Sequence, residues 1–184
     1  YGISEGSPSM ASIERTASQA LIEVTMALNN GSTSSDLEFG AIGHSIGCAA
    51  ALRLATALQT TTPLRHVALC APFTSLPEVA KVLLPILKIV PTWLIATLTS
   101  RNAWDNMAEV SHLARNPAKA PRVDVIHGTR DEICPQDHGV ALEGRMKSLQ
   151  LASTFRSVKA GHNDILGTKA FAEWLEKKVH MADA

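Results

Sequence analysis

The segment with the clearest chemical content is a serine flanked by two glycines. The residues Gly43-His44-Ser45-Ile46-Gly47 fit the pattern G-x-S-x-G, which carries a nucleophilic serine on a sharp turn between a strand and a helix. An apolar stretch of strand length precedes the pattern, and a stretch rich in Ala and Leu follows it. We therefore predict that Ser45 is a nucleophile; a serine that merely caps the helix is the alternative.

The flanking residues would shape this turn for chemistry. A side chain at Gly43 or Gly47 is expected to collide with neighbouring strand or helix backbone. The strained turn would expose the hydroxyl of Ser45, and the backbone amide of Ile46 would lie in the first turn of the helix, where negative charge is stabilised. We expect that amide to contribute to an oxyanion hole.

A serine hydroxyl is a weak nucleophile and needs a general base. His162 follows a strand expected at residues 154–159, so it would reach the same end of a parallel sheet as Ser45. The other six histidines lie in the serine turn itself, in expected strands, or in helical, helix-start and terminal segments. We therefore predict that His162 is the base.

The base in turn needs an acid that orients it. Asp131 follows the strand expected at residues 122–127 after a short turn, which makes it our prediction. Glu132 and Asp137 are the competing carboxylates. Glu132 would point away in a tight turn, and Asp137 would lie at the start of a helix.

The elements that must hold these residues alternate between strand and helix. Apolar runs predict strands at residues 37–42, 66–71 and 122–127, and the more polar run 154–159 predicts an edge strand. Helical spacing of apolar residues predicts helices at 9–28, at 46–58 and around 171–179. We predict one α/β domain over residues 1–184, with a doubly wound, mostly parallel open sheet.

Between the second and third strands the chain carries many apolar residues. Pro85 and Pro91 divide residues 76–98 into pieces too short to cross a membrane. We predict an apolar helical insertion at about 76–110. It would either pack on the sheet as an ordinary helix or cover an active site.

Composition and missing motifs restrict the partners. Seventeen Lys and Arg residues balance seventeen Asp and Glu residues, and no basic run is present, which argues against nucleic acid as a partner. The sequence has no H-E-x-x-H, clustered cysteines or G-x-G-x-x-G, so we expect neither a metal nor a cofactor. Three cysteines without a C-x-x-C pair indicate free buried thiols and a reducing compartment. We expect a cytoplasmic protein, with peripheral membrane contact as an alternative; the sequence does not fix its oligomeric state.

Five motifs in order resemble one family. They are YGISEGSPS at 1–9, GHSIG at 43–47, APFTS at 71–75, HGTRDEICP at 127–135 and GHND at 161–164. This set resembles the α/β-hydrolase-domain group that includes lysophospholipid lipases and protein depalmitoylases, and serine aminopeptidase-like hydrolase domains. The resemblance implies the α/β-hydrolase fold, and it places the family's catalytic serine, aspartate and histidine on Ser45, Asp131 and His162.

The sequence departs from that family in two ways. Asp124 stands in a strand where the family has an apolar residue, and a buried carboxylate is tolerated only if it is paired. The family also has several strands before its Tyr-Gly segment, and a loop after one of them completes the oxyanion hole. This sequence starts at Tyr1, so we expect the C-terminal half of the fold without its first strands, which leaves the strand at 37–42 with an unpaired edge.

These observations lead to one main hypothesis and two alternatives. The main hypothesis is a serine hydrolase that cleaves a carboxylic ester or thioester of a lipid or other acyl substrate through an acyl-enzyme. The apolar segment 76–98 favours an acyl substrate over a sugar. A serine peptidase acting on short peptides would use the same three residues, and a non-catalytic binding domain would follow from the missing strands.

Overall fold

Four parallel strands form the centre of the structure, a computed structural model that describes residues 9–28, 38–62, 64–84, 89–91 and 104–180. The strands are β1 (Gly40–His44), β2 (His66–Cys70), β3 (Arg122–Gly128) and β4 (Ser153–Val158). They lie in the order β1-β2-β3-β4, and all three neighbouring pairs are parallel. The predicted parallel α/β sheet is confirmed, with the polar strand β4 at an edge.

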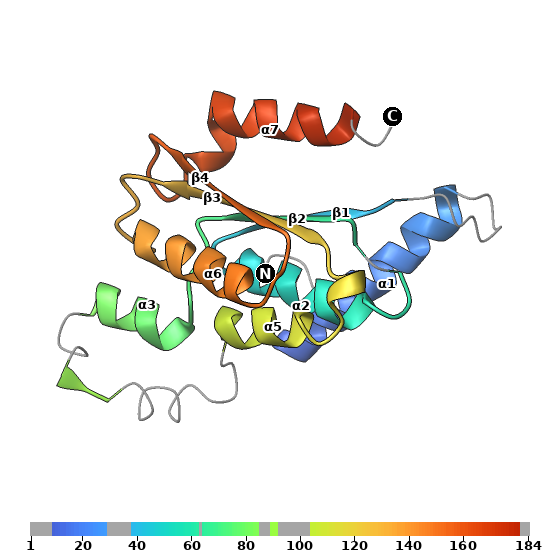
Figure 1. The fold of residues 1–184 in the computed structure, drawn as a ribbon, viewed down its shortest axis with the longest axis horizontal. Coiled ribbons are helices and arrows are strands. Elements are labelled where there is room, and N and C mark those ends of the chain that lie inside the picture. Colours follow the sequence, from blue (N-terminus) through green and yellow to red (C-terminus); the bar gives the residue numbers. More distant parts are fainter. Residues whose placement is uncertain (1–8, 29–37, 63, 85–88, 92–103, 181–184) are drawn as a thin grey trace.

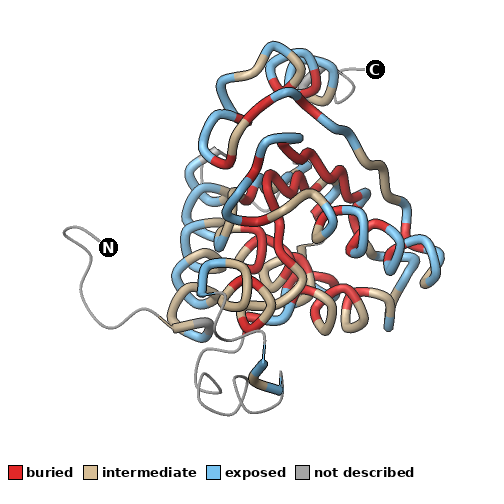
Figure 2. Tube along the Cα trace, turned by 90° about the vertical axis from the view of Figure 1, so that its left-hand side faces the viewer, coloured by how far each residue is buried: buried red, intermediate tan, exposed pale blue. Residues whose placement is uncertain are grey.

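Helices cover both faces of the sheet (Figure 1). The helices α2 (Ile46–Leu58), α5 (Asn106–Leu113) and α6 (Gln136–Ser148) lie on one face, and α7 (Lys169–His180) lies on the other. Alternate residues of the strands serve the two faces: Val67 and Val125 pack toward α2 and α6, whereas Ala68 and Ile126 pack toward α7. Figure 2 shows the buried residues gathered between these layers. The sheet is therefore doubly wound.

The first helix, α1 (Met10–Leu28), packs against α2. Leu21 is partly buried against the core cluster that α2 shares with the sheet. Arg53 on α2 joins α1 to α5, since its guanidinium lies 2.7 Å from Glu14 and 2.9 Å from Glu109. These two ion pairs link α1, α2 and α5.

The first strand differs in its bounds from the prediction. Its observed range is set by pairing with β2, in a register that runs from Gly40 opposite His66 to His44 opposite Cys70. The sequence prediction followed the apolar run 37–42 instead, and residue 37 lies outside the described residues. Because hydrogen-bond pairing and not hydropathy defines a strand, the strand extends to His44 and delivers Ser45 directly at its end.

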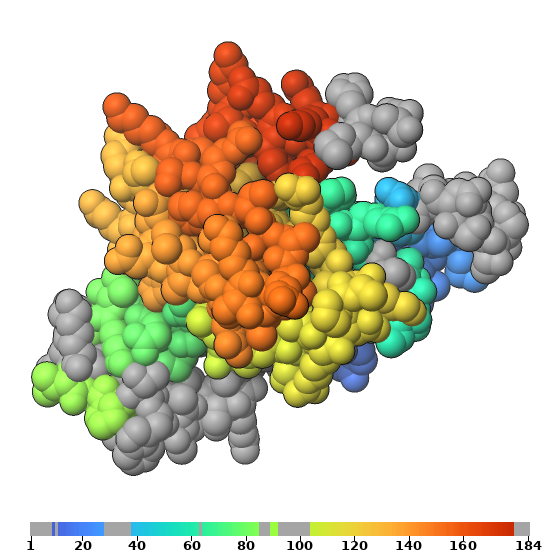
Figure 3. Space-filling view, in the orientation of Figure 1, coloured from blue at the N-terminus to red at the C-terminus, as the bar shows by residue number. Residues whose placement is uncertain are grey.

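The chain is joined to itself on either side of most of the segment predicted as an insertion. Ser75 and Asp105 form an isolated antiparallel bridge, and the Leu76 amide donates to the Trp104 carbonyl at 2.9 Å. The helix α3 (Leu76–Leu83) follows at once and lies at the periphery of the molecule (Figure 3, green). Residues 85–88 and 92–103 lie outside the described part of the chain. The expectation that this segment covers an active site therefore also lies outside the described residues. Within the described residues, no helix combines the length and apolar character needed to span a membrane.

The carboxylate within the sheet is paired, as its position requires. Asp124 on β3 is 3% exposed and accepts hydrogen bonds from Thr154 on β4 and from Trp174 on α7, the latter at 3.1 Å. The Lys178 ammonium lies 3.0 Å from the same carboxylate. Burial by itself raises the pKa of Asp124, but these three partners outweigh it, so the net pKa is lowered.

We predict that Asp124→Asn lowers the free energy of unfolding by about 1–3 kcal/mol at pH 7, because Lys178 loses its charged partner. The depressed pKa means that this stabilisation is complete above the ordinary pKa of 3.8 and is lost as pH falls through the folded value. Urea unfolding of both proteins should show a constant difference from about pH 8 to 5 that shrinks below about pH 4.

The matched control is Glu173→Gln, which removes a carboxylate from an exposed pair with Lys169 on the same helix α7. It should change the stability by less than about 0.5 kcal/mol. An equal effect of the two substitutions at every pH would contradict a stabilising role for the buried carboxylate.

Candidate active site

The turn after β1 holds Ser45 in an unusual backbone conformation. Its φ is 54° and its ψ is −120°, and α2 begins at the next residue. The Ser45 amide donates to the Cys70 carbonyl at 2.9 Å, which attaches the turn to the end of β2. Because a positive φ is strained for a residue with a side chain, this conformation needs the support of the surrounding strands.

The two glycines of the turn have different reasons for being there. A Cβ atom on Gly43 would lie 2.4 Å from the carbonyl oxygen of Gly47, which is backbone and has little freedom to move. A Cβ atom on Gly47 would meet nothing within 4 Å. The expected collision is therefore found at Gly43 only, and the expectation for Gly47 was wrong because that position faces open space.

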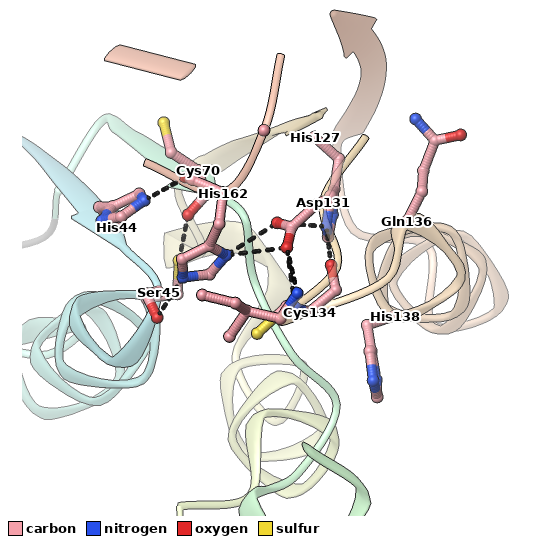
Figure 4. A network of polar contacts seen from close by, with 12 residues as sticks. His44, Ser45, Cys70, His127, Asp131, Cys134, Gln136, His138 and His162 are labelled. Carbon is pink, nitrogen blue, oxygen red and sulfur yellow. Dashed lines mark hydrogen bonds and ion pairs between the residues drawn. The ribbon is translucent and has the colours of Figure 1, made fainter. Parts of the chain in front are cut away.

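The structure brings together the three side chains that the sequence singled out (Figure 4). The His162 Nε2 atom lies 2.9 Å from the Ser45 hydroxyl oxygen. The His162 Nδ1 atom lies 2.8 Å and 3.0 Å from the two carboxylate oxygens of Asp131. The side chain of Asp131 is fully buried and that of His162 is 8% exposed, so the contact between them is shielded from water.

The loop after β3 holds the Asp131 carboxylate from a second side. The amides of Ile133 and Cys134 donate to its Oδ1 atom at 3.0 Å and 2.8 Å. The loop is closed by the fully buried His127, whose Nε2 lies 2.7 Å from the Cys134 carbonyl and 3.4 Å from the carboxylate. Burial lowers the pKa of His127, so its ring is neutral and its Nε2 carries the proton that the carbonyl accepts. Sequence reasoning placed His127 only in a strand.

The segment that carries His162 lies tightly against the end of β3. The Arg130 amide donates to the Ala160 carbonyl at 3.0 Å, and the Thr129 amide donates to the Val158 carbonyl at 2.8 Å. A Cβ atom on Gly128 would lie 2.4 Å from the same Ala160 oxygen. The H-G pair of the sequence motif therefore contains a glycine for steric reasons.

The competing carboxylates lie elsewhere. Glu132 is exposed, and Asp137 lies in the first turn of α6, where a negative charge suits the helix dipole. His138, also on α6, contacts the Thr74 hydroxyl at 2.9 Å and points away from the three residues (Figure 4). Among the described residues, no group of three or more His, Cys, Asp or Glu side chains is arranged to hold a metal ion.

Three free cysteines lie close to the site, and all are buried. They are distributed over the three core clusters, one in each: Cys48 under the turn, Cys70 at the end of β2 and Cys134 in the loop that holds Asp131. Burial raises the pKa of Cys70 and of Cys134 to about 12, with the Asp131 charge adding to the effect on Cys134. These thiols are protonated at neutral pH.

Several solved structures that this chain resembles in fold are hydrolases. An esterase of Pyrococcus furiosus shares 17% identity over 86% of this chain and 56% of its own, with a TM-score of 0.54. An acylaminoacyl peptidase of Pyrococcus horikoshii shares 13% identity over 94% of this chain and 28% of its own, with a TM-score of 0.57. An α/β-hydrolase enzyme from a lagoon-sediment metagenome in Morocco shares 16% identity over all of this chain and 75% of its own, with a TM-score of 0.54.

No protein-family model and no curated protein matches the chain. The similarity to the solved structures is thus one of fold, and the chain spans little more than half of the esterase and about a quarter of the peptidase. This chain has the α/β-hydrolase fold, as the sequence motifs implied.

The two turn glycines give a matched pair of substitutions. We predict that Gly43→Ala lowers the free energy of unfolding by roughly 3 kcal/mol or more, because the methyl group would overlap backbone. Gly47→Ala should leave it unchanged or raise it by up to about 1 kcal/mol, since alanine favours a helix and has room there. Urea unfolding of both variants provides the comparison, and similar losses from the two would contradict the steric difference.

Proposed function

We propose that this chain, an α/β-hydrolase by fold, is a serine hydrolase in which Ser45 is the nucleophile, His162 the general base and Asp131 the acid that orients it. The observation that carries the proposal is the continuous series of contacts from the Ser45 hydroxyl through His162 to Asp131. Three residues far apart in sequence meet there at hydrogen-bonding distances. That arrangement suits nucleophilic catalysis on a carbonyl group.

In the acylation step, the Ser45 oxygen attacks the carbonyl carbon of the substrate while its proton passes to His162 Nε2. The resulting imidazolium donates through Nδ1 to Asp131, whose charge is held in place by the amides of Ile133 and Cys134. His162 then gives the proton to the leaving group. Water hydrolyses the acyl-enzyme by the same route in reverse.

Negative charge on the substrate oxygen needs donors. The amide of Ile46 lies in the first turn of α2, where backbone amides have no acceptor within the helix. Because it directly follows Ser45 at the start of the helix, we assign it to the oxyanion hole together with the positive end of the helix dipole.

The substrate that we propose is a carboxylic ester or thioester with an apolar acyl group. Exposed aliphatic side chains lie close to each of the three residues in the sequence: Ile46 directly after Ser45, Ile133 two positions after Asp131 and Leu166 four positions after His162. Such side chains favour an acyl group over a sugar or a charged substrate. The esterase of similar fold supports an ester, and the acylaminoacyl peptidase makes a short peptide the second candidate. The three free buried thiols fit a reducing compartment such as the cytoplasm.

Ser45→Ala should abolish hydrolysis of p-nitrophenyl butyrate, with a loss on the order of a thousandfold or more, because the attacking oxygen is gone. The fold should be retained, since the change removes a single atom. Labelling by a fluorophosphonate, which reacts only with an activated serine, should occur in the native chain and vanish in the variant. Absence of labelling in the folded native chain would favour the non-catalytic alternative. Turnover of a p-nitroanilide dipeptide above that of the ester would favour the peptidase.

The assignment of the acid has its own test. Asp131→Asn should reduce kcat by roughly a hundredfold or more. The neutral amide has no negative charge to stabilise the protonated His162 ring that forms during the reaction. Asp137→Asn and Glu132→Gln remove neighbouring carboxylates that lie outside the site, and we expect changes of less than about threefold. Ester hydrolysis by the three variants decides among the carboxylates, and a larger loss from Asp137→Asn would show that the acid is misassigned.

A further inference from the structure

A histidine outside the three proposed catalytic residues holds the main chain of the base. The Nε2 atom of His44 lies 2.8 Å from the carbonyl oxygen of His162, and the centroids of the two rings are 5.1 Å apart. A carbonyl oxygen only accepts hydrogen bonds, so Nε2 of His44 must carry a proton and donate it. Figure 4 shows His44 on the Ser45 side of the His162 ring. The bond joins two parts of the chain that are 118 residues apart.

The need for this bond follows from the strand order. Ser45 follows β1 and His162 follows β4, and these strands lie at the two edges of the described sheet. The segment after β4 must therefore cross the ends of β3 and β2 to reach Ser45. It is attached to the β3 side through Ala160, whose carbonyl accepts from Arg130. On the β1 side it is attached by two bonds, one from His44 to the His162 carbonyl and one between His162 and Ser45.

Only one of these two bonds survives the reaction. In the acyl-enzyme the Ser45 oxygen is an ester oxygen without a proton, so the bond through which the free hydroxyl donates to His162 is lost. The His44 bond involves no reacting atom and persists. We propose that His44 is a positioning residue that keeps His162 in place during hydrolysis of the acyl-enzyme; the inference rests on the serine hydrolase function proposed above.

The step that depends on this positioning is deacylation. The oxygen of a water molecule attacks the acyl carbonyl carbon and forms the new carbon–oxygen bond while one water proton moves to His162 Nε2. The bond between the carbonyl carbon and Ser45 Oγ then breaks, and His162 returns the proton to Oγ. A carboxylic acid leaves and Ser45 is regenerated. Asp131 alone holds the ring at Nδ1, and His44 fixes the backbone from which the ring projects.

The experiment compares substitutions that differ in where they place a donor. His44→Gln has its amide nitrogen at about the reach of Nε2, whereas His44→Asn carries the same amide one methylene shorter. His44→Leu has no donor. The control is His66→Leu, which removes a partly buried histidine from β2 at the amino end of the sheet, opposite Gly40 and remote from Ser45. Hydrolysis of p-nitrophenyl acetate gives kcat, which deacylation limits for this activated ester, and kcat/KM, which reports acylation.

We expect His44→Leu and His44→Asn to lower kcat about tenfold, the effect of one lost hydrogen bond on a rate, and to change kcat/KM by less than about threefold. KM therefore falls with kcat, and the initial burst of nitrophenol approaches one equivalent as the acyl-enzyme accumulates. His44→Gln should recover kcat to within about threefold of the native value, and His66→Leu should leave both constants unchanged.

Three results would overturn the proposal: an unchanged kcat in folded His44→Leu and His44→Asn, an equal loss of kcat and kcat/KM in both, or equal kcat for Gln and Asn at position 44. The Gln and Asn pair keeps the test valid if His44→Leu does not fold. Failure of the proposed function itself gives a different result, because the native chain would then show either no ester hydrolysis or hydrolysis that Ser45→Ala retains in full. An active native chain that requires Ser45 but is indifferent to His44 would reject the positioning residue alone.

Discussion

The distance between the first and last strands is the constraint on which the site depends. All four strands are parallel, so their carboxyl ends lie on the same side of the sheet. Ser45 and His162, however, follow β1 and β4, which are the two outermost strands of the described sheet. The chain after β4 therefore has to pass over the end of β3. Gly128 permits this close approach, because a side chain at that position would collide with the Ala160 carbonyl oxygen. The loop from Asp131 to Cys134 fills the position between them and presents the carboxylate to His162. The close contact at Gly128 and the loop that holds Asp131 are both consistent with this path of the chain.

The residues that the structure brings together could be predicted because each one follows a segment that the sequence predicts to be a strand. The G-x-S-x-G pattern singled out Ser45, and the rule that parallel strands end on the same side of a sheet indicated that Asp131 and His162 lie near it. The contact of His44 with the His162 carbonyl could not be found in this way, since it joins residues 118 apart and neither motif indicates that the His44 ring meets the main chain of His162. The error at Gly47 has a similar cause, because the spacing of the motif does not reveal which glycine faces backbone. The partners of Asp124 come from β4 and α7, and only the packed fold identifies them.

The same fold is found in an esterase and in an acylaminoacyl peptidase. In the proposed mechanism, Ser45, His162 and Asp131 act only on the carbonyl group and the proton, which esters, thioesters and amides share. Under that mechanism, selection among these substrates would arise from the surfaces around the serine. Ile46, which is exposed and directly follows Ser45 in the sequence, is one part of such a surface.

The placement of the three cysteines makes the native sequence its own reporter of local opening. A thiol reagent attacks the thiolate, and burial keeps Cys48, Cys70 and Cys134 protonated and out of reach in the folded chain. Each cysteine belongs to a different core cluster. The reaction rate of each thiol therefore measures how often its own cluster becomes accessible to the reagent. Mass spectrometry of the modified peptides would thus rank the three core clusters by the free energy of their local opening, with no label introduced into the sequence.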